Sequence, residues 1–249
     1  DCLSHPVYIL DVDEKNADAL AWCFTDAQTM KLIPFKFPPL GPNEVRVNVL
    51  YAGLCQSDVL TVRSKWGIPL YPIAPGHEII GEVTLIGSKV ESLKKGDIVG
   101  MGTRRYCCNE CKNCRNSFEH MCLNVNERKT YGKYWGGYAT QMQQPADFFF
   151  KISNDFKLNL GAPLFCAGAT TFNPIQRFII NNEQFKNKKI NAAVCGIGGL
   201  GHVAIQFLSK LNCNVTGLTC SMNKKDLILE LGAQNVIDMN NSEEIKKHE

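Results

Sequence analysis

An α/β fold with a β-rich first domain is predicted by two patterns in the sequence. The first is strand-like runs: residues 44–49 alternate strictly between polar and apolar side chains, as in a half-buried strand. Further short apolar runs at 78–83, 97–99 and 148–152 are separated by Gly and Lys turns. Residues 1–40 hold mixed polar and apolar pieces, and no element is assigned to them.

The second pattern begins after about residue 154, where strands and helices alternate. Apolar strands are expected at 190–195, 214–220 and 235–237, and helices at 199–211 and 224–231. Such β-α-β-α-β order predicts a parallel, doubly wound sheet. Residues 158–178 favour a helix that is interrupted near Pro163 and Pro174. We therefore expect one domain at 1–155 and a second at 156–249.

Charge and hydropathy exclude several classes of protein. The 27 basic and 24 acidic residues give a formal charge of only +3, which argues against an electrostatic nucleic-acid binder. No stretch approaches the length of a membrane-spanning helix. Of the 12 cysteines, four lie in one short cluster with two-residue gaps and the others are scattered. This spacing suits a metal site better than a disulfide framework. We expect the cytoplasm or another reducing intracellular compartment.

Four of these cysteines form the first candidate metal site. They are spaced with two, two and seven residues between them, at Cys108, Cys111, Cys114 and Cys122. Four thiolates can close a tetrahedral zinc shell with no open position, which makes a site structural. The flanking residues are polar, so we expect an exposed lobe at about 104–124 that zinc stabilises. Unligated cysteines and an iron–sulfur site are the alternatives, and Cys107 is positioned to compete with Cys108.

A second candidate metal site is spread along the chain. Cys55 follows a predicted strand, His77 lies in a Pro-Gly-His-Glu run, and Cys166 lies far downstream. Each is a weak signal alone, because a lone Cys or His usually has a structural role. Together they offer two sulfurs and an imidazole, which with water make a known catalytic zinc shell.

A glycine-rich loop follows the strand expected at 190–195 and opens the next helix. It contains Gly196, Gly198, Gly199, Leu200 and Gly201. In this context the G-x-G-x-x-G pattern is typical of a Rossmann domain, whose helix N-terminus meets a dinucleotide pyrophosphate. The alternative is a glycine-rich turn that binds nothing.

The end of the next strand indicates which dinucleotide binds. An NAD enzyme usually carries an acid there, but position 221 is Ser and no acid occurs between Gly201 and Asp226. Ser221, Lys224 and Lys225 instead offer donors and positive charge that suit the 2′-phosphate of NADP(H). The alternative is a solvated helix start with ordinary surface lysines.

A family resemblance rests on the order and spacing of many short motifs. From about Ala21 to its end, the chain is similar to medium-chain, zinc-dependent alcohol dehydrogenases, and it most resembles the cinnamyl alcohol dehydrogenase group. The motifs are Gly53-Leu54-Cys55-Gln56-Ser57-Asp58, Trp66-Gly67, Tyr71-Pro72, Pro75-Gly76-His77-Glu78, Gly96-Asp97-Ile98-Val99-Gly100, the four-cysteine lobe, Tyr134-Trp135-Gly136-Gly137-Tyr138 and Cys166-Ala167-Gly168-Ala169-Thr170-Thr171.

The resemblance implies a GroES-like catalytic domain followed by a Rossmann domain, with two zinc ions per chain. It implies that Cys55, His77 and Cys166 hold the catalytic zinc, and that Glu78 can approach the metal. Asp58 matches a carboxylate that orients the imidazole, and Ser57 matches the hydroxyl that passes the substrate's proton toward solvent. Thr170 falls in a cofactor-binding motif.

Two residues depart from the pattern of the family. Gln56 stands where many relatives carry His, and Leu60 stands where many carry a polar relay residue. Because an apolar Leu60 cannot pass a proton, relay from Ser57 would need water or the ribose. The departures cast doubt on the rate of proton transfer rather than on zinc binding.

The function expected from these features is an NADP(H)-dependent alcohol dehydrogenase or aldehyde reductase acting on small or aromatic substrates. Trp66 and Trp135 are candidates for the pocket wall, although either can belong to the core. The alternative is a catalytically inactive, dehydrogenase-like subunit with a structural role in a larger assembly. A quinone or enone reductase is disfavoured, because such enzymes lack the zinc ligands.

Only the first half of a Rossmann domain follows Gly196, so the second half of the nucleotide domain is expected to be absent. A homodimer is expected of a full-length protein. If the chain ends near residue 249, a covering protein partner is expected instead, because the third strand would be an exposed edge.

Overall fold

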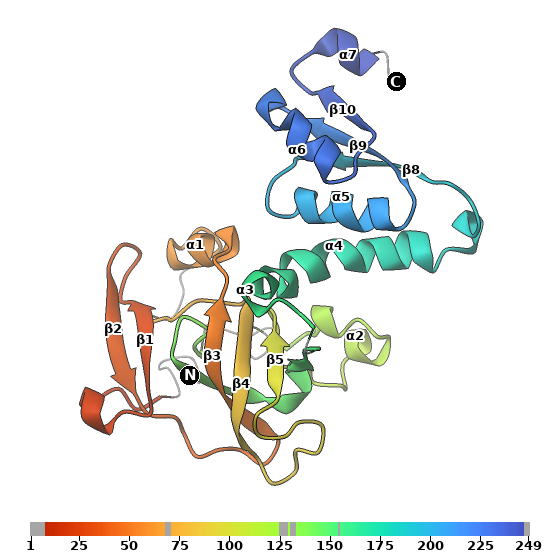
Figure 1. Ribbon diagram of the computed structural model, residues 1–249. Coiled ribbons are helices and arrows are strands. Elements are labelled where there is room, and N and C mark those ends of the chain that lie inside the picture. Colours follow the sequence, from red (N-terminus) through yellow and green to blue (C-terminus); the bar gives the residue numbers. More distant parts are fainter. Residues whose placement is uncertain (1–7, 68–70, 125–128, 130–132, 154, 247–249) are drawn as a thin grey trace. The chain divides into compact units, whose positions relative to one another are not determined.

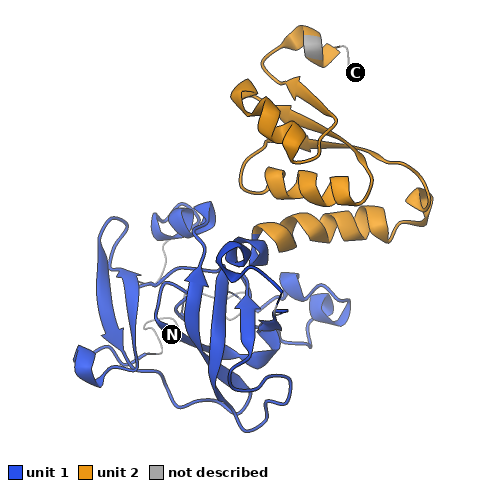
Figure 2. Cartoon of the chain, viewed as in Figure 1, with its two compact units in different colours: residues 1–166 blue, residues 167–249 orange. Residues whose placement is uncertain are grey.

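The computed structural model describes residues 8–67, 71–124, 129, 133–153 and 155–246 (Figure 1). The chain divides into two compact units, Asp1–Cys166 and Ala167–Glu249 (Figure 2). The division falls a little beyond the boundary expected at residue 155. The predicted α/β class with a β-rich first part is confirmed. Among the described residues, no helix is long and apolar enough to cross a membrane.

The first unit is built on a five-stranded antiparallel sheet in the order β6-β3-β4-β5-β7. Val47 of β3 lies opposite Val83 of β4 on one side and Met142 of β6 on the other. All three side chains are buried, so the core of the unit forms against this part of the sheet. The strands are β3 (Glu44–Ala52), β4 (Ile79–Ile86), β5 (Ile98–Met101), β6 (Gln141–Pro145) and β7 (Phe150–Lys151).

A β-hairpin occupies residues to which sequence analysis assigned no element. Its strands are β1 (Ala19–Phe24) and β2 (Met30–Phe35), and the Asp26 carboxylate accepts the backbone N–H groups of Gln28 and Thr29 at the turn. Beside the hairpin, Trp135 is 1% exposed and packs edge-on against Phe35. Trp135 therefore belongs to the core and not to the wall of a pocket.

Short helices connect the strands of the first unit. The helix α1 (Gln56–Val62) follows β3 and carries Ser57 and Asp58, two of the residues that were expected near a metal. The others are η1 (Glu14–Asn16), α2 (Lys112–Arg115), η2 (Glu119–Met121), η3 (Ala146–Phe148), α3 (Leu158–Gly161) and η4 (Ala162–Phe165). The predicted interruption at Pro163 is present as the change from α3 to η4.

The second unit holds a parallel three-stranded sheet in the order β10-β9-β8. Its strands are β8 (Asn191–Cys195), β9 (Asn214–Thr219) and β10 (Asn235–Asp238), and α5 (Gly201–Lys210) and α6 (Lys225–Glu230) connect them. The predicted β-α-β-α-β order is confirmed. Within the described residues β8 and β10 are the edges of this sheet, and β10 is the third strand that was expected to be an edge.

The helix α4 (Ala167–Ile175) corrects one expectation. Pro174 lies inside it, and the chain continues as a π-helical turn, η5 (Gln176–Ile180), instead of breaking. Proline removes one helical hydrogen bond, and a local wide turn can absorb that loss. The rings of Phe172 on α4 and Phe207 on α5 pack edge-on at 5.3 Å, which holds the helix in place. The remaining helices are η6 (Glu183–Phe185), η7 (Met222–Lys224) and α7 (Ser242–Lys246).

Two glycines at the end of β5 determine where Cys166 lies. A Cβ atom on Gly100 would come within 1.8 Å of the Phe165 ring, and one on Gly102 would come within 2.5 Å of the Phe165 carbonyl oxygen. Glycines spaced by two residues therefore open one face of the strand to Phe165. Because Cys166 is the next residue, this contact fixes its position above the sheet.

We expect Gly102→Ala to destabilise the protein by about 1–3 kcal/mol, because the added methyl group would collide with backbone rather than with a movable side chain. Urea unfolding measures the effect. Ser88→Ala, at an exposed turn, is the control and should change the free energy of unfolding by less than about 0.5 kcal/mol. Equal stability of Gly102→Ala and the parent would contradict the packing described for Phe165.

Candidate metal centres and dinucleotide loop

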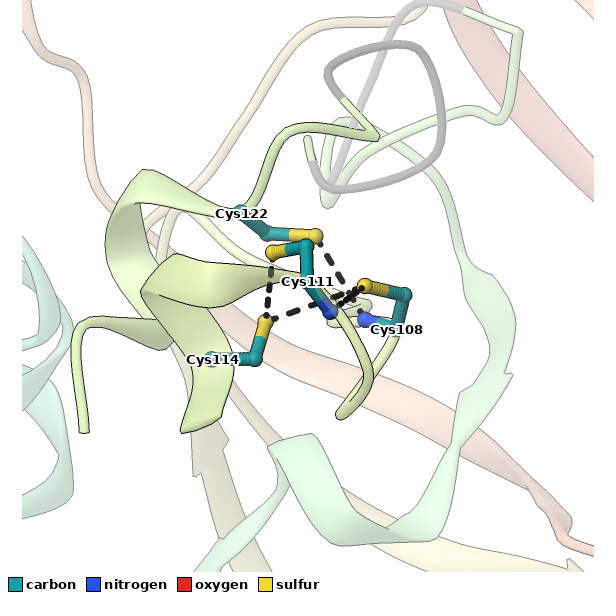
Figure 3. Close-up of side chains that lie close together, drawn as sticks. All are labelled: Cys108, Cys111, Cys114 and Cys122. Carbon is teal, nitrogen blue, oxygen red and sulfur yellow. Dashed lines mark hydrogen bonds between the residues drawn. The ribbon is translucent and has the colours of Figure 1, made fainter. Parts of the chain in front are cut away.

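The four lobe cysteines converge on one point. Their sulfur atoms lie within 4.8 Å of one another, and the Cys111 and Cys114 sulfurs are 3.5 Å apart (Figure 3). The Cys108 and Cys114 sulfurs are 3.9 Å apart. A disulfide needs a separation of about 2.05 Å, whereas sulfurs at the corners of a zinc tetrahedron lie roughly 3.8 Å apart. The geometry fits thiols around one small ion.

Backbone N–H groups surround these sulfurs. Cys108 N–H donates to the Cys122 sulfur at 3.4 Å, and Cys111 N–H donates to the Cys108 sulfur at 3.3 Å. Hydrogen bonds from the backbone of Leu123 and Cys114 lower the pKa of Cys111 to about 6. Donors of this kind favour the thiolate, which is the form that binds metal. Cys107 lies apart from this arrangement, and its thiol donates to the Asn109 side chain at 3.0 Å.

A second cluster brings together residues from three distant parts of the first unit. The ligand atoms of Cys55, His77, Glu78 and Cys166 lie within 4.8 Å of one another. Cys55 is the N-cap of α1, His77 and Glu78 directly precede β4, and Cys166 follows η4. The structure thus places all four residues that were expected at the catalytic zinc beside one another.

The Asp58 carboxylate holds this cluster together. Its Oδ1 accepts the Gly76 N–H at 3.0 Å and lies 2.8 Å from His77 Nδ1, and its Oδ2 accepts the Cys55 N–H at 3.1 Å. Asp58 is 1% exposed, and a buried charge of this kind needs such donors. Because Nδ1 of His77 faces Asp58, Nε2 is the ring nitrogen that can bind a metal.

Burial and charge oppose each other at His77. Burial lowers the pKa of the imidazole, but the Asp58 carboxylate and the Cys166 sulfur together raise it to about 10. Burial also raises the pKa of Glu78, which is 4% exposed. Glu78 fits here because Gly53 has no side chain: a Cβ atom there would lie 2.0 Å from Glu78 Oε2.

Tyr138 is a site residue that sequence reasoning missed as a contributor. Its hydroxyl group lies 3.2 Å from the Gly53 carbonyl oxygen and 3.4 Å from Asp58 Oδ2. Gly76 has a φ of 102°, and a Cβ atom there would collide with the backbone of Tyr138. The sequence showed Tyr138 only as part of the Gly-Gly-Tyr run at 136–138, and this motif did not indicate a role for its hydroxyl group.

Ser57, which was expected to pass the proton, and Leu60, which stands in place of a polar relay residue, both lie on α1. Ser57 is half-buried in the first turn, and its backbone N–H donates to the Cys55 sulfur at 3.5 Å. Leu60 is half-buried on the same helix. The backbone of Ser57 therefore lies beside the Cys55 sulfur of the cluster.

The glycine loop in the second unit has the geometry of an anion-binding turn. Gly196 has a φ of 83°, and a Cβ atom on Gly201 would lie 2.2 Å from the Gly196 carbonyl oxygen, so both positions require glycine. A Cβ atom on Gly198 or Gly199 would meet open space. Among the described residues, the N–H groups of Gly199 and Leu200 donate to no protein acceptor. Such donors at a helix start suit a phosphate.

One basic residue after β9, Lys224, reaches the same loop. Lys224 Nζ donates to the Ile197 carbonyl oxygen at 3.2 Å, and the Ser221 N–H donates to Thr219 Oγ1 at 3.0 Å. Lys225 begins α6. Lys224 therefore joins the two segments that were expected to bind the cofactor. Thr170 is exposed on α4 and makes no hydrogen bond to the loop in the described part of the chain.

Comparison with known proteins finds relatives that cover most of the chain. Residues 41–154 match the family model described as alcohol dehydrogenase GroES-like domain. An aldehyde reductase from Synechocystis sp. is 36% identical over 221 residues, which cover 88% of this chain and 63% of the relative. Cinnamyl alcohol dehydrogenase from Sorghum bicolor superposes with a TM-score of 0.83 at 29% identity, covering 92% of this chain and 66% of that one.

A second solved structure, CAD from Helicobacter pylori complexed with NADP(H), is 28% identical with a TM-score of 0.76. The match covers 88% of this chain and 63% of that one. The chain spans 63–65% of the length of the first curated relatives that it matches. The relatives named here are described as enzymes or by an enzyme group, so they give no support to the alternative of an inactive subunit.

We expect Asp58→Asn to destabilise the metal-free protein by about 1–3 kcal/mol, because the amide has no negative charge and only one acceptor oxygen for donors that now bond both carboxylate oxygens. The pKa of His77 is raised from 6.5 to about 10 in the folded protein, so the protonated imidazole stabilises the fold. That contribution is complete below the unfolded value and is lost as the pH rises toward the folded value. The difference between Asp58→Asn and the parent should therefore be larger at about pH 6 than at about pH 9.

Urea unfolding in the presence of a chelator at the two pH values makes this measurement. Tyr138→Phe is the matched control, because it removes one neutral donor and should cost about 0.5–1.5 kcal/mol with no comparable pH dependence. A difference for Asp58→Asn that grows with pH would contradict the assigned pairing of Asp58 with His77.

Proposed function

Because the chain belongs to the medium-chain, zinc-dependent alcohol dehydrogenase family, we propose that it transfers hydride between NADP(H) and an alcohol or aldehyde. The first unit is the GroES-like domain of that family, and the second unit holds the β-α-β-α-β half of a Rossmann fold. The proposal includes small or aromatic substrates, as first expected from the sequence.

The buried cluster of Cys55, His77, Glu78 and Cys166 is the observation that carries this proposal. It offers two sulfurs, one imidazole nitrogen and one carboxylate oxygen within 4.8 Å of one another. Two thiolates and an imidazole, with one position left open, are the donor set of a catalytic zinc site. Zinc bound there would act as a Lewis acid toward the oxygen of the alcohol or aldehyde.

The protein's own residues would orient that site and move the proton. Asp58 holds the His77 ring at Nδ1, which leaves Nε2 as the nitrogen that would bind the metal, and its bond to the Cys55 N–H fixes the start of α1. Ser57 is proposed to pass the substrate's proton toward solvent from the first turn of α1. Because Leu60 is apolar, that path would continue through water or the ribose.

We assign the second metal to the cysteine lobe. Four sulfurs separated by distances close to those of a tetrahedron suit one zinc ion, whereas the ligands of an iron–sulfur cluster bind different irons and need wider spacing. No position remains open for substrate, so this zinc would stabilise the lobe at 104–124.

Cofactor choice is proposed from the loop and the residues after β9. The donors of Gly199 and Leu200 would bind the pyrophosphate, and Ser221, Lys224 and Lys225 would bind the 2′-phosphate. Two observations support this division: Lys224 contacts Ile197 within the loop, and no acid replaces Ser221. The named relatives are consistent with it, since one was solved with NADP(H).

We predict about two zinc ions per chain in pure protein. Cys111→Ser should lose one zinc and lower the melting temperature sharply, because the lobe would lose its ion. Cys166→Ala should lose the other zinc with a smaller effect on melting. Elemental analysis and thermal unfolding of both variants test this. Less than one zinc per chain in the parent would contradict the prediction.

We predict that the whole protein reduces an aromatic aldehyde with NADPH in preference to NADH. Cys166→Ala should abolish turnover, because it removes a ligand of the Lewis-acid site. Ser221→Asp should shift the ratio of kcat/KM values toward NADH by about tenfold or more, since a carboxylate would face the 2′-phosphate. Steady-state assays with both cofactors measure each effect.

Ser242→Asp is the matched control for added charge, since Ser242 begins the distant helix α7. It should leave the cofactor preference unchanged. Equal rates with NADH and NADPH in the parent would refute the assignment of NADP(H), and a fully active Cys166→Ala variant would refute the assignment of the catalytic zinc.

A further inference from the structure

We propose that His202 is a positioning residue for the glycine loop: its ring holds the Gly198–Gly199 peptide so that the Gly199 N–H stays directed toward the dinucleotide pyrophosphate. The inference rests on the proposed function, in that it assumes this loop binds a dinucleotide. It gives His202 a role that is not filled by the glycines of the loop or by the residues proposed to bind the 2′-phosphate.

Gly198 receives two hydrogen bonds from the same residue. Its carbonyl oxygen accepts the backbone N–H of His202 at 3.1 Å and lies 3.0 Å from His202 Nδ1. A carbonyl oxygen can only accept, so Nδ1 carries the proton. The first bond belongs to the start of α5 and would exist with any residue at 202 except proline. The second depends on the imidazole.

The peptide plane explains why this second bond matters. In a trans peptide the C=O of Gly198 and the N–H of Gly199 are parts of one planar unit and point in opposite directions. Holding the carbonyl toward α5 therefore turns the Gly199 N–H away from it. A reversed peptide would present a carbonyl oxygen to the phosphates in place of a donor, which an anion site cannot tolerate.

The loop has little else to fix this peptide. Neither Gly198 nor Gly199 has a side chain, a Cβ atom on either would meet open space, and glycine adopts many backbone conformations. The Gly198 N–H donates to the Gly196 carbonyl oxygen at 3.2 Å, but that bond restrains the preceding peptide. The His202 ring is thus the one side chain that donates to the carbonyl of the Gly198–Gly199 peptide in the described structure.

Substitutions at 202 can separate the hydrogen bond from packing. In His the donor Nδ1 is bonded to Cγ, and in Asn the amide nitrogen is bonded to Cγ as well, so Asn can donate from nearly the same place. Leu resembles Asn in shape but has no donor. Gln carries its amide nitrogen one bond further out. The three variants therefore form a matched set.

The experiment measures NADPH binding by calorimetry on the zinc-loaded full chain and on the three variants. His202→Leu and His202→Gln should weaken binding by about three- to tenfold, the effect of one lost hydrogen bond. His202→Asn should stay within about twofold of the parent. Binding of adenosine 2′-monophosphate, which has the 2′-phosphate but no pyrophosphate, should be unchanged in every variant.

The outcomes distinguish the two proposals. If the parent binds NADPH and His202→Leu binds it equally well, or if Asn weakens binding as much as Leu does, His202 does not position the loop. Weaker binding of adenosine 2′-monophosphate in step with NADPH would also overturn the inference, because the damage would then extend beyond the loop. If the parent binds neither NADPH nor NADH, the proposed function itself fails.

Discussion

The cluster of Cys55, His77, Glu78 and Cys166 depends on one buried carboxylate. Asp58 bonds the Cys55 N–H, the Gly76 N–H and the His77 ring, and these groups come from two segments separated by the whole of α1 and the loop after it. Charge-assisted hydrogen bonds are among the stronger polar contacts in proteins, and a carboxylate that is 1% exposed needs them. The same interaction therefore satisfies the buried charge and brings two of the ligands together.

Glycines make room for the other two residues of the cluster, Glu78 and Cys166, because they have no side chains. Glu78 occupies the space that a side chain on Gly53 would fill, and Phe165 lies where side chains on Gly100 and Gly102 would project. The first contact turns Glu78 toward Cys55, and the second places Cys166 over β5. The four residues of the cluster thus come together for two reasons: the Asp58 carboxylate binds groups from separate segments, and the glycines allow close approach. A substitution at these glycines would disturb the ligands without removing any of them.

The parts of the structure that sequence analysis predicted are those encoded by neighbouring residues. The spacing of the cysteines at 108–122 is enough to predict a shared site, and the glycine pattern at 196–201 is enough to predict the loop. The polar and apolar alternation around Val47 likewise predicts a strand. The hairpin of β1 and β2 was missed because its inner face packs on distant aromatic residues such as Trp135. The link from Tyr138 to Asp58 spans 80 positions, and no local pattern reports it. Pro174 stays in a helix because α4 is packed against α5 and continues into a π-turn.

The two metal clusters stand in opposite relations to folding. The lobe cysteines lie in one short loop whose helices, α2 and η2, are each a single turn, so an ion is needed to oppose the entropy of ordering the loop. The second cluster takes its residues from segments beside β3, β4 and η4, and the hydrogen bond to Asp58 orients the His77 ring. We therefore expect a metal in the lobe to contribute to folding, whereas contacts within the protein hold the other cluster together. Such contacts suit a site with an open position, because they keep its geometry without a full set of ligands.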